Sequence, residues 1–277
     1  MFQILGYFKS INNTLLADTP VIPDTNFSAR GGTGGADHWI FTEPYDLHAA
    51  FVGAVTVTAA QFNDATLNAV NIPQIYPVNL GITPLTNPQV MDLRSSPVPL
   101  PLNEEIPLNI SAGAGGAEDC YGLIWIKPRG NQGNDLAMPP VTTSTPRVLA
   151  LVTASIVLTK GVWSPFVTLT FTNPLKGGAY QVNGAMFVVS NGLAFKLNFV
   201  KSPLYMGRKL WPGSLTEKTY GNVPLRFGPT WMGPYGRFNN FELPQLSVLG
   251  STTTGATTYT GYLDMTYLGD TNSQAMP

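Results

Sequence analysis

The sequence predicts an all-β protein of two tandem antiparallel β-sandwich or jelly-roll domains, with long Pro/Gly-rich loops and an N-terminal arm. Runs rich in β-branched and aromatic residues recur about every 8–15 residues, interrupted by long loops, as in sandwiches and barrels. Gly and Pro contribute 28 and 24 of the 277 residues, and their clusters separate the runs. No long amphipathic helix alternates with these runs, so a parallel α/β sheet is not expected.

A repeated pattern indicates that the domains are two. Residues 105–126 and residues 242–268 each contain a strand-like run, a loop of small residues and a second strand-like run. The copies open with Glu105-Ile106-Pro107 and Glu242-Leu243-Pro244, which lie 137 residues apart, close to half of the chain. Each copy stands near the end of one half, as expected for two similar β-domains.

The division of the chain follows from its composition. We expect an arm over residues 1–38, domain 1 over 39–135, a linker over 136–146 and domain 2 over 147–277. The linker lies in a stretch rich in Gly, Pro and Thr. The arm combines a short apolar piece, compatible with a small helix or strand, with prolines and a glycine run. Such a segment has no core of its own and is expected to run over a surface.

The elements expected in domain 1 begin at Trp39. Residues 51–58 are rich in β-branched side chains and predict a strand. Residues 59–70 are compatible with one short helix. Residues 71–101 contain seven prolines, a density that excludes helix and central strand and predicts a long loop with short extended pieces.

Domain 2 shows clearer alternation. Residues 152–158, 167–172 and 193–199 each place apolar side chains at every second position, as a strand with one buried face does. Asn191-Gly192 follows an apolar run and predicts a tight hairpin. Residues 203–236 form an aromatic excursion rich in Pro and Gly.

The charge of the chain is low and unevenly distributed. Charged residues make up 11% of the sequence, against about a quarter in ordinary proteins. Residues 1–137 contain 5 Lys/Arg and 12 Asp/Glu, a net charge of −7, and residues 138–277 contain 10 and 4, a net charge of +6. Oppositely charged halves favour head-to-tail contacts between copies, which close into rings. Chance segregation of charges, and a Thr/Asn-rich surface needing few charges, are the alternatives.

Targeting and redox signals are absent. The single cysteine, Cys120, excludes an intrachain disulfide and is expected to be buried in a strand. The N-terminus has no basic and apolar pattern of a secretory signal, and no run of about 18 apolar residues predicts a spanning helix. We expect synthesis in the cytoplasm without a signal peptide.

Signatures of enzymes are sparse. The histidines, His38 and His48, have no partner at metal-ligand spacing. No Gly-x-Ser-x-Gly elbow and no phosphate-binding glycine loop occur. We therefore expect no catalytic residue, no cofactor and no enzymatic activity.

Four carboxylates flank the strands of the early pattern: Glu104, Glu105, Glu118 and Asp119. If those strands pair as a hairpin, the four could gather into a calcium site or a glycosidase-like pair. Solvated strand ends are the favoured interpretation.

Basic residues are too scattered to predict strong direct binding of nucleic acid. Aromatic, apolar and basic side chains outside the expected cores are instead candidates for contacts between subunits. These candidates are Phe2, Ile4, Phe8, Arg208, Trp211, Trp231 and Tyr235.

The chain resembles the double jelly-roll major capsid proteins of tailless icosahedral bacteriophages, particularly those that contain a membrane. The shared characters are two similar β-domains, long loops, an N-terminal arm and opposite charges on the two halves. The features that carry the resemblance are the paired 105–126 and 242–268 patterns, the 127–146 linker stretch and the arm. It covers nearly the whole chain but is one of architecture, without a diagnostic motif. It implies a homotrimer of pseudo-hexagonal outline that tiles an icosahedral virion shell, with minor capsid or membrane proteins as further partners beneath it.

Three other interpretations remain open at this point. One is a single-jelly-roll or other sandwich capsid protein with a projecting domain. Another is a carbohydrate-binding or adhesion protein of two β-sandwich domains, in which exposed aromatic side chains stack on sugars. The third is a glycosidase-like enzyme that uses the four carboxylates.

Overall fold

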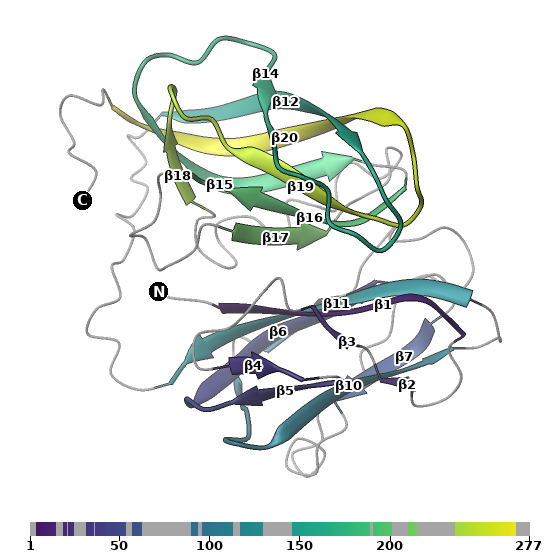
Figure 1. Cartoon of the computed structure of the whole chain (residues 1–277). Helices are drawn as coiled ribbons and strands as arrows, with labels where there is room; N and C mark the ends of the chain where they lie inside the picture. The colour runs from purple at the N-terminus through teal and green to yellow at the C-terminus, as the bar shows by residue number, and fades with distance from the viewer. Residues whose placement is uncertain are drawn as a thin grey trace. The chain divides into compact units, whose positions relative to one another are not determined.

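A computed structural model describes residues 4–14, 19–20, 22–24, 32–35, 37–53, 57–62, 90–93, 96–112, 117–129, 146–188, 191–200, 210–214 and 236–269. These residues form strands, turns and extended loops without a helix, which confirms the all-β prediction. The chain divides into an N-terminal unit, Phe2–Asn134, and a C-terminal unit, Asp135–Pro277. Each unit contains two antiparallel sheets (Figure 1).

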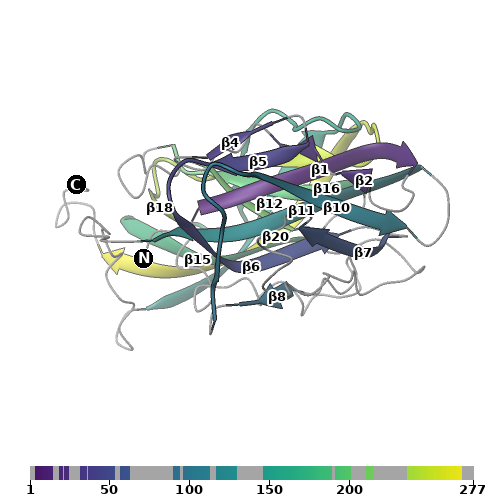
Figure 2. The same ribbon diagram turned by 90° about the horizontal axis from the view of Figure 1, so that it is seen from below.

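The N-terminal unit holds the first eleven strands. They are β1 Ile4–Thr14, β2 Thr19–Pro20, β3 Ile22–Pro23, β4 Gly32–Gly34, β5 His38–Phe41, β6 Tyr45–Gly53, β7 Val57–Phe62, β8 Val90–Asp92, β9 Val98–Pro99, β10 Glu105–Ala112 and β11 Ala117–Pro128. One sheet has the order β3-β1-β11-β6-β8, with β9 also beside β6. The other has the order β2-β10-β5-β4, and β7 pairs with β10, beside which it lies in Figure 2.

The segment expected to be an arm supplies a strand of this unit. In β1, Ile4 lies opposite Ile126 and Thr14 opposite Ala117, so β1 pairs along most of β11. The place beside β11 gives the backbone N–H and C=O groups of β1 hydrogen-bond partners within the sheet. Of the two forms that the sequence allowed for this apolar piece, a small helix or a strand, the structure has the strand.

The C-terminal unit holds the remaining strands. They are β12 Arg147–Val157, β13 Val167–Thr168, β14 Thr170–Phe171, β15 Ala179–Val188, β16 Gly192–Asn198, β17 Leu210–Ser214, β18 Gly236–Asn239, β19 Gln245–Gly250 and β20 Ala256–Gly269. One sheet has the order β14-β12-β20-β15-β18, and the other has the order β13-β19-β16-β17.

The repeated sequence patterns connect two sheets and are not hairpins. β10 and β11 belong to different sheets of the N-terminal unit, and β19 and β20 belong to different sheets of the C-terminal unit. The offset of 137 residues is also out of step with burial. It matches buried Ile106 and Leu108 with half-buried Leu243 and Gln245, whereas the residues of β19 after Gln245 are all buried. Because strand faces alternate with period 2, a shift of one residue exchanges the inner and outer faces.

Two further expectations in the C-terminal unit are corrected in the same way. Asn191-Gly192 joins β15 to β16, which lie in different sheets, so the turn is not a hairpin. Asn191 has a φ of 76°, which suits the sharp reversal. The alternating run 167–172 is split, because β13 pairs with β19 while β14 pairs with β12. This run therefore crosses from one sheet to the other.

The remaining expected loops and the expected short helix lie only partly within the described residues. Residues 57–62 form β7, which replaces the first part of the short helix compatible with 59–70. The proline-rich 71–101 stretch contains the short strands β8 and β9. Its remaining residues 71–89 and 94–95, the 136–145 part of the linker, and most of the 203–236 excursion lie outside the described residues.

Buried apolar side chains from both sheets form the core of each unit. In the N-terminal unit, the Phe41 ring of β5 meets the Tyr45 ring of β6 with centroids 5.3 Å apart. In the C-terminal unit, the Phe187 ring of β15 meets the Phe195 ring of β16 at 4.8 Å. The alternating residues of 152–158 are buried as predicted: Val152, Ala154, Ile156 and Leu158.

Candidate functional site

The four carboxylates of the early pattern do not gather. Glu104 and Glu105 stand at the start of β10, whereas Glu118 and Asp119 follow the loop at its other end. The seven residue steps from Glu105 to Ala112 span about 23 Å in an extended strand. The backbone therefore separates the four residues into two pairs, too far apart for one calcium site or one glycosidase pair.

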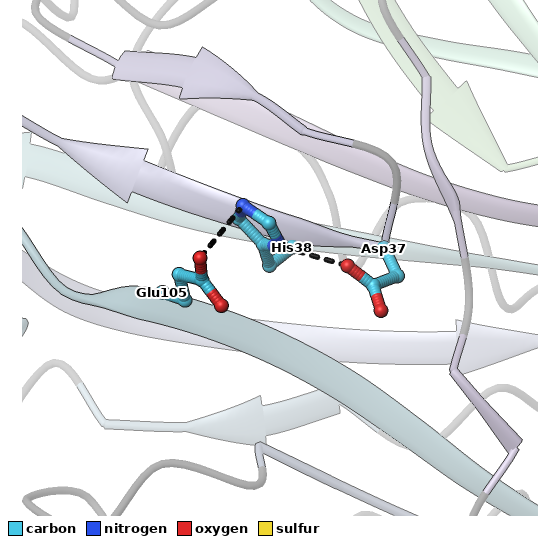
Figure 3. A network of polar contacts seen from close by, with 3 residues as sticks. All are labelled: Asp37, His38 and Glu105. Atoms are coloured by element: carbon cyan, nitrogen blue, oxygen red, sulfur yellow. Dashed lines mark hydrogen bonds and ion pairs between the residues drawn. The ribbon is translucent and has the colours of Figure 1, made fainter.

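One of these carboxylates belongs instead to a network with a histidine (Figure 3). The His38 Nδ1 atom donates a hydrogen bond of 2.7 Å to Asp37 Oδ1, and His38 Nε2 lies 3.7 Å from Glu105 Oε1. The imidazole is 17% exposed, whereas the carboxyl side chains of Asp37 and Glu105 are 53% and 71% exposed. The cross-strand register explains the meeting, because Pro107 lies opposite His38 and Glu105 is its diagonal neighbour on the same face.

The ring of His38 also depends on a glycine. The Gly35 backbone N donates a hydrogen bond of 2.7 Å to the His38 carbonyl oxygen, and a Cβ on Gly35 would lie 2.5 Å from His38 Nε2. The arrangement ties β5 to β10. Within the described residues, no three side chains of His, Cys, Asp or Glu are arranged to hold a metal ion.

The predicted contact residues are only partly visible. Ile4 and Phe8 lie in β1, and Trp211 lies in β17 opposite Leu197. The other four, Phe2, Arg208, Trp231 and Tyr235, lie outside the described residues. The structure therefore gives the backbone places of three of the seven candidates.

A more exposed aromatic residue stands on the turn between β18 and β19, which we call the Phe241 turn (residues 239–242). The Phe241 side chain is 79% exposed. Asn239 Oδ1 accepts hydrogen bonds from the backbone N of Phe241 at 3.0 Å and of Glu242 at 2.9 Å. Asn240 is tied to Gly178 twice, because its backbone N donates to the Gly178 carbonyl and its Oδ1 accepts from the Gly178 N.

The corresponding turn of the N-terminal unit precedes β10, and we call it the Leu102 turn (residues 101–104). Leu102 is 48% exposed. The backbone N of Asn103, whose φ is 57°, donates a hydrogen bond of 2.9 Å to the Phe41 carbonyl oxygen. Both turns therefore present a large apolar side chain from a backbone fixed by hydrogen bonds to another part of the same unit.

The sequence analysis missed both turns. Each carries one exposed apolar residue next to an asparagine and close to a glutamate, in Leu102-Asn103-Glu104 and in Asn240-Phe241-Glu242. An isolated exposed apolar residue is common on protein surfaces, so this signal alone could not single them out.

Comparisons with known proteins add no relationship, since no protein-family model, curated protein or solved structure matches the chain. In the part of the chain that the structure describes, no helix has the length and apolar character needed to cross a membrane.

Proposed function

We propose that the chain is a viral major capsid protein in which each unit is a jelly roll and three copies form a pseudo-hexagonal capsomer of an icosahedral shell. The observation that carries the proposal is the strand order shared by the two units. β1-β11-β6-β8 corresponds strand for strand to β12-β20-β15-β18. In the second sheets, β10 pairs with both β5 and β7, as β19 pairs with both β13 and β16.

This order supports the jelly-roll assignment for a topological reason. In each unit the last strand lies beside the first strand, and the strand before it lies in the opposite sheet. Double-sheet folds of two Greek keys have this property and are used in viral capsid and lectin domains. Because each chain has two such units, a ring of three copies contains six similar units. Six similar units in a ring suit a hexagonal lattice.

The electrostatics support assembly from identical copies. The net charges of −7 in residues 1–137 and +6 in residues 138–277 would attract the first half of one copy to the second half of the next. Such contacts are heterologous and close into rings when the rotation permits. The low charge content suits a protein whose surface is largely covered by its neighbours.

The proposed mechanism is structural. Copies of the chain pack laterally through interfaces of the size typical of permanent complexes, about 2,000 Å² or more in total. The partners are other copies, neighbouring capsomers, and minor capsid or membrane proteins beneath the shell. The protein would reside in the virion and would not hold the genome through a basic tail.

The native mass of the purified protein tests this proposal. Light scattering after size exclusion should give about three times the 29.8 kDa of one chain, or a large particle with a regular lattice under the electron microscope. A monomer at every concentration would overturn the capsid proposal. A glycan array would then test the carbohydrate-binding alternative, which shares the fold.

A further inference from the structure

We infer that copies of this chain contact one another through the Phe241 turn of one copy and the Leu102 turn of the next, with the two apolar side chains packed together. The inference rests on the proposed self-assembly and names the residues that carry it. The contact is heterologous, because a turn of a C-terminal unit meets a turn of an N-terminal unit.

The Phe241 turn is built to present its side chain. Among the exposed large hydrophobic side chains of the described residues, Phe241 has the highest exposed fraction, 79%. The side chain of Asn239 accepts a hydrogen bond from the Phe241 backbone N, and two hydrogen bonds between Asn240 and Gly178 tie the turn to the residues before β15. When the backbone is preorganised, binding costs little conformational entropy. Burial of an aromatic side chain can then contribute strongly to the affinity.

The Leu102 turn occupies the same topological position in the other unit. Each turn enters the strand that lies opposite the last strand of its unit, β10 in one case and β19 in the other. Each turn has an asparagine whose backbone N donates to a carbonyl of an earlier segment. Asn103 donates to Phe41 at the end of β5, and Asn240 donates to Gly178 just before β15. The apolar residue precedes the asparagine in the Leu102 turn and follows it in the Phe241 turn. The two turns therefore share an exposed apolar residue without sharing a sequence motif.

Charge complementarity indicates that the occupant is a second copy. Beside Leu102 stand the exposed carboxylates Glu104 and Glu105. Beside the Phe241 turn, the connection that ends at Gly178 carries exposed Lys176, whose ammonium lies 4.9 Å from the Tyr267 ring centroid. The Leu102 turn thus has two exposed acids beside its apolar residue. The acid of the Phe241 turn, Glu242, is half-buried with one carboxyl oxygen enclosed, and an exposed base stands beside that turn. This local difference has the same sign as the −7 and +6 of the two halves.

Three variants and a control test the apolar contact in the full chain. They are Phe241→Ser, Leu102→Ser, the double variant and Val162→Ser. Val162 is the control because it is an exposed apolar residue, 52% exposed, at the other end of the unit. Its carbonyl accepts a hydrogen bond from Gly250, which precedes β20, whereas Gly178 lies near the end of β20. The fourteen residues of β20 separate these positions, a distance of about 43 Å. Light scattering and sedimentation over a range of concentrations measure the association constant, and circular dichroism confirms that each variant is folded.

Each single variant should weaken association at least tenfold, and the double variant should be no weaker than the worse single one, because both remove the same contact. The Val162 control should stay within twofold of the original protein. Additive losses would show that the two residues contact different surfaces, which overturns the pairing. Normal assembly of Phe241→Ser also overturns it while leaving the capsid proposal intact, whereas a monomeric original protein overturns both.

A charge exchange tests the polar part of the contact separately. Lys176→Glu should weaken association, and adding Glu104→Lys to that variant should restore it by at least half of the loss on a logarithmic scale. Failure of this rescue, with Lys176→Glu alone weakening association, would overturn the proposed orientation of the two turns. Raising the salt concentration should shrink the effect of the single charge variant.

Discussion

The guanidinium of Arg147 binds the carboxylate of Asp264 through two parallel hydrogen bonds, each 2.8 Å long. This pair joins the first strand of the C-terminal unit to its last strand. The Asp264 side chain is 5% exposed, whereas that of Arg147 is 64% exposed. The hydrogen bond and the negative charge of Asp264 raise the pKa of Arg147. Together with the hydrogen bond from Tyr267 N to the Pro146 carbonyl, the pair fixes the chain at its entry into β12.

Replacing Arg147 by Ala should destabilise the C-terminal unit, because it leaves a buried carboxylate without its bidentate partner. We expect a loss of about 1–2 kcal/mol in the free energy of unfolding, a figure reduced for the exposure of the arginine. Arg147→Lys should lose about half as much, since an ammonium cannot form the bidentate pair. Urea unfolding measures both, and equal stability of all three proteins would refute the role of the pair.

Gly178 should tolerate no side chain. Its φ is 138°, and an added Cβ would lie against the carbonyl oxygen of Gly269 and the ring of Tyr267. Gly178→Ala should therefore cost at least about 2 kcal/mol, from backbone strain and from displacement of its neighbours. Gly177 is the matched control, because nothing lies within 4 Å of a Cβ built there. If both alanine variants melt at the same temperature, the assigned geometry of this turn is incorrect.

Ser164 supports the edge of β19. Its Oγ accepts a hydrogen bond of 3.0 Å from the buried Val248 N, and its carbonyl accepts one of 2.6 Å from Ser247 Oγ. Ser164→Ala should cost about 1–3 kcal/mol because the Val248 amide loses its acceptor away from water. Exposed Ser155 provides the control, and Ser155→Ala should change stability by less than about 0.5 kcal/mol. Amide hydrogen exchange of Val248 should accelerate in the first variant and stay unchanged in the second.

The stability of the N-terminal unit should fall as His48 becomes protonated. Burial lowers the pKa of His48 below its ordinary value of 6.5, the charge of Lys127 lowers it further, and Asp46 partly opposes both. The unfolded chain therefore binds this proton more readily than the folded chain. The stabilising contribution is present above about pH 6.5 and is lost as the pH falls through and below that value.

The His48→Gln variant separates this effect from other titrations. Calorimetry between about pH 7.5 and 5.5 should show a smaller pH dependence of the melting temperature for this variant than for the original protein. Lys127→Met should raise the pKa of His48, which NMR can follow because the chain has only 2 histidines. An unchanged His48 titration in the Lys127 variant would contradict the electrostatic cause.

Local patterns predicted the strands well and their partners poorly. The alternation of residues 152–158 predicted which side of β12 is buried, since inward and outward side chains follow the strand period alone. The same rule could not place β15 and β16 in different sheets, because Asn191-Gly192 permits both a hairpin and a crossing between sheets. Nor could it show that β1 would pair with β11, which lies more than a hundred residues further along the chain.

The candidate site was harder to predict for a related reason. Contact between His38 and Glu105 depends on the register of β5 against β10, which pairs positions 67 residues apart. The gathering of Glu104, Glu105, Glu118 and Asp119 was postulated from a hairpin that the sheet order does not contain. Exposure of Phe241 and Leu102 likewise depends on which parts of each unit cover their turns, and sequence spacing carries no information about that.

The pairing of first and last strands in each unit sets the order in which the protein can fold during synthesis. β1 cannot reach its place until β11 has left the ribosome, and β12 must wait for β20. During these intervals the backbone edges of β1 and β12 are open to other strands, a state that favours wrong pairings. The N-terminal unit nevertheless has its whole strand set by Pro128, before the first strand of the C-terminal unit begins at Arg147. Among the strands that the structure describes, a nascent chain therefore holds at most one incomplete unit at a time.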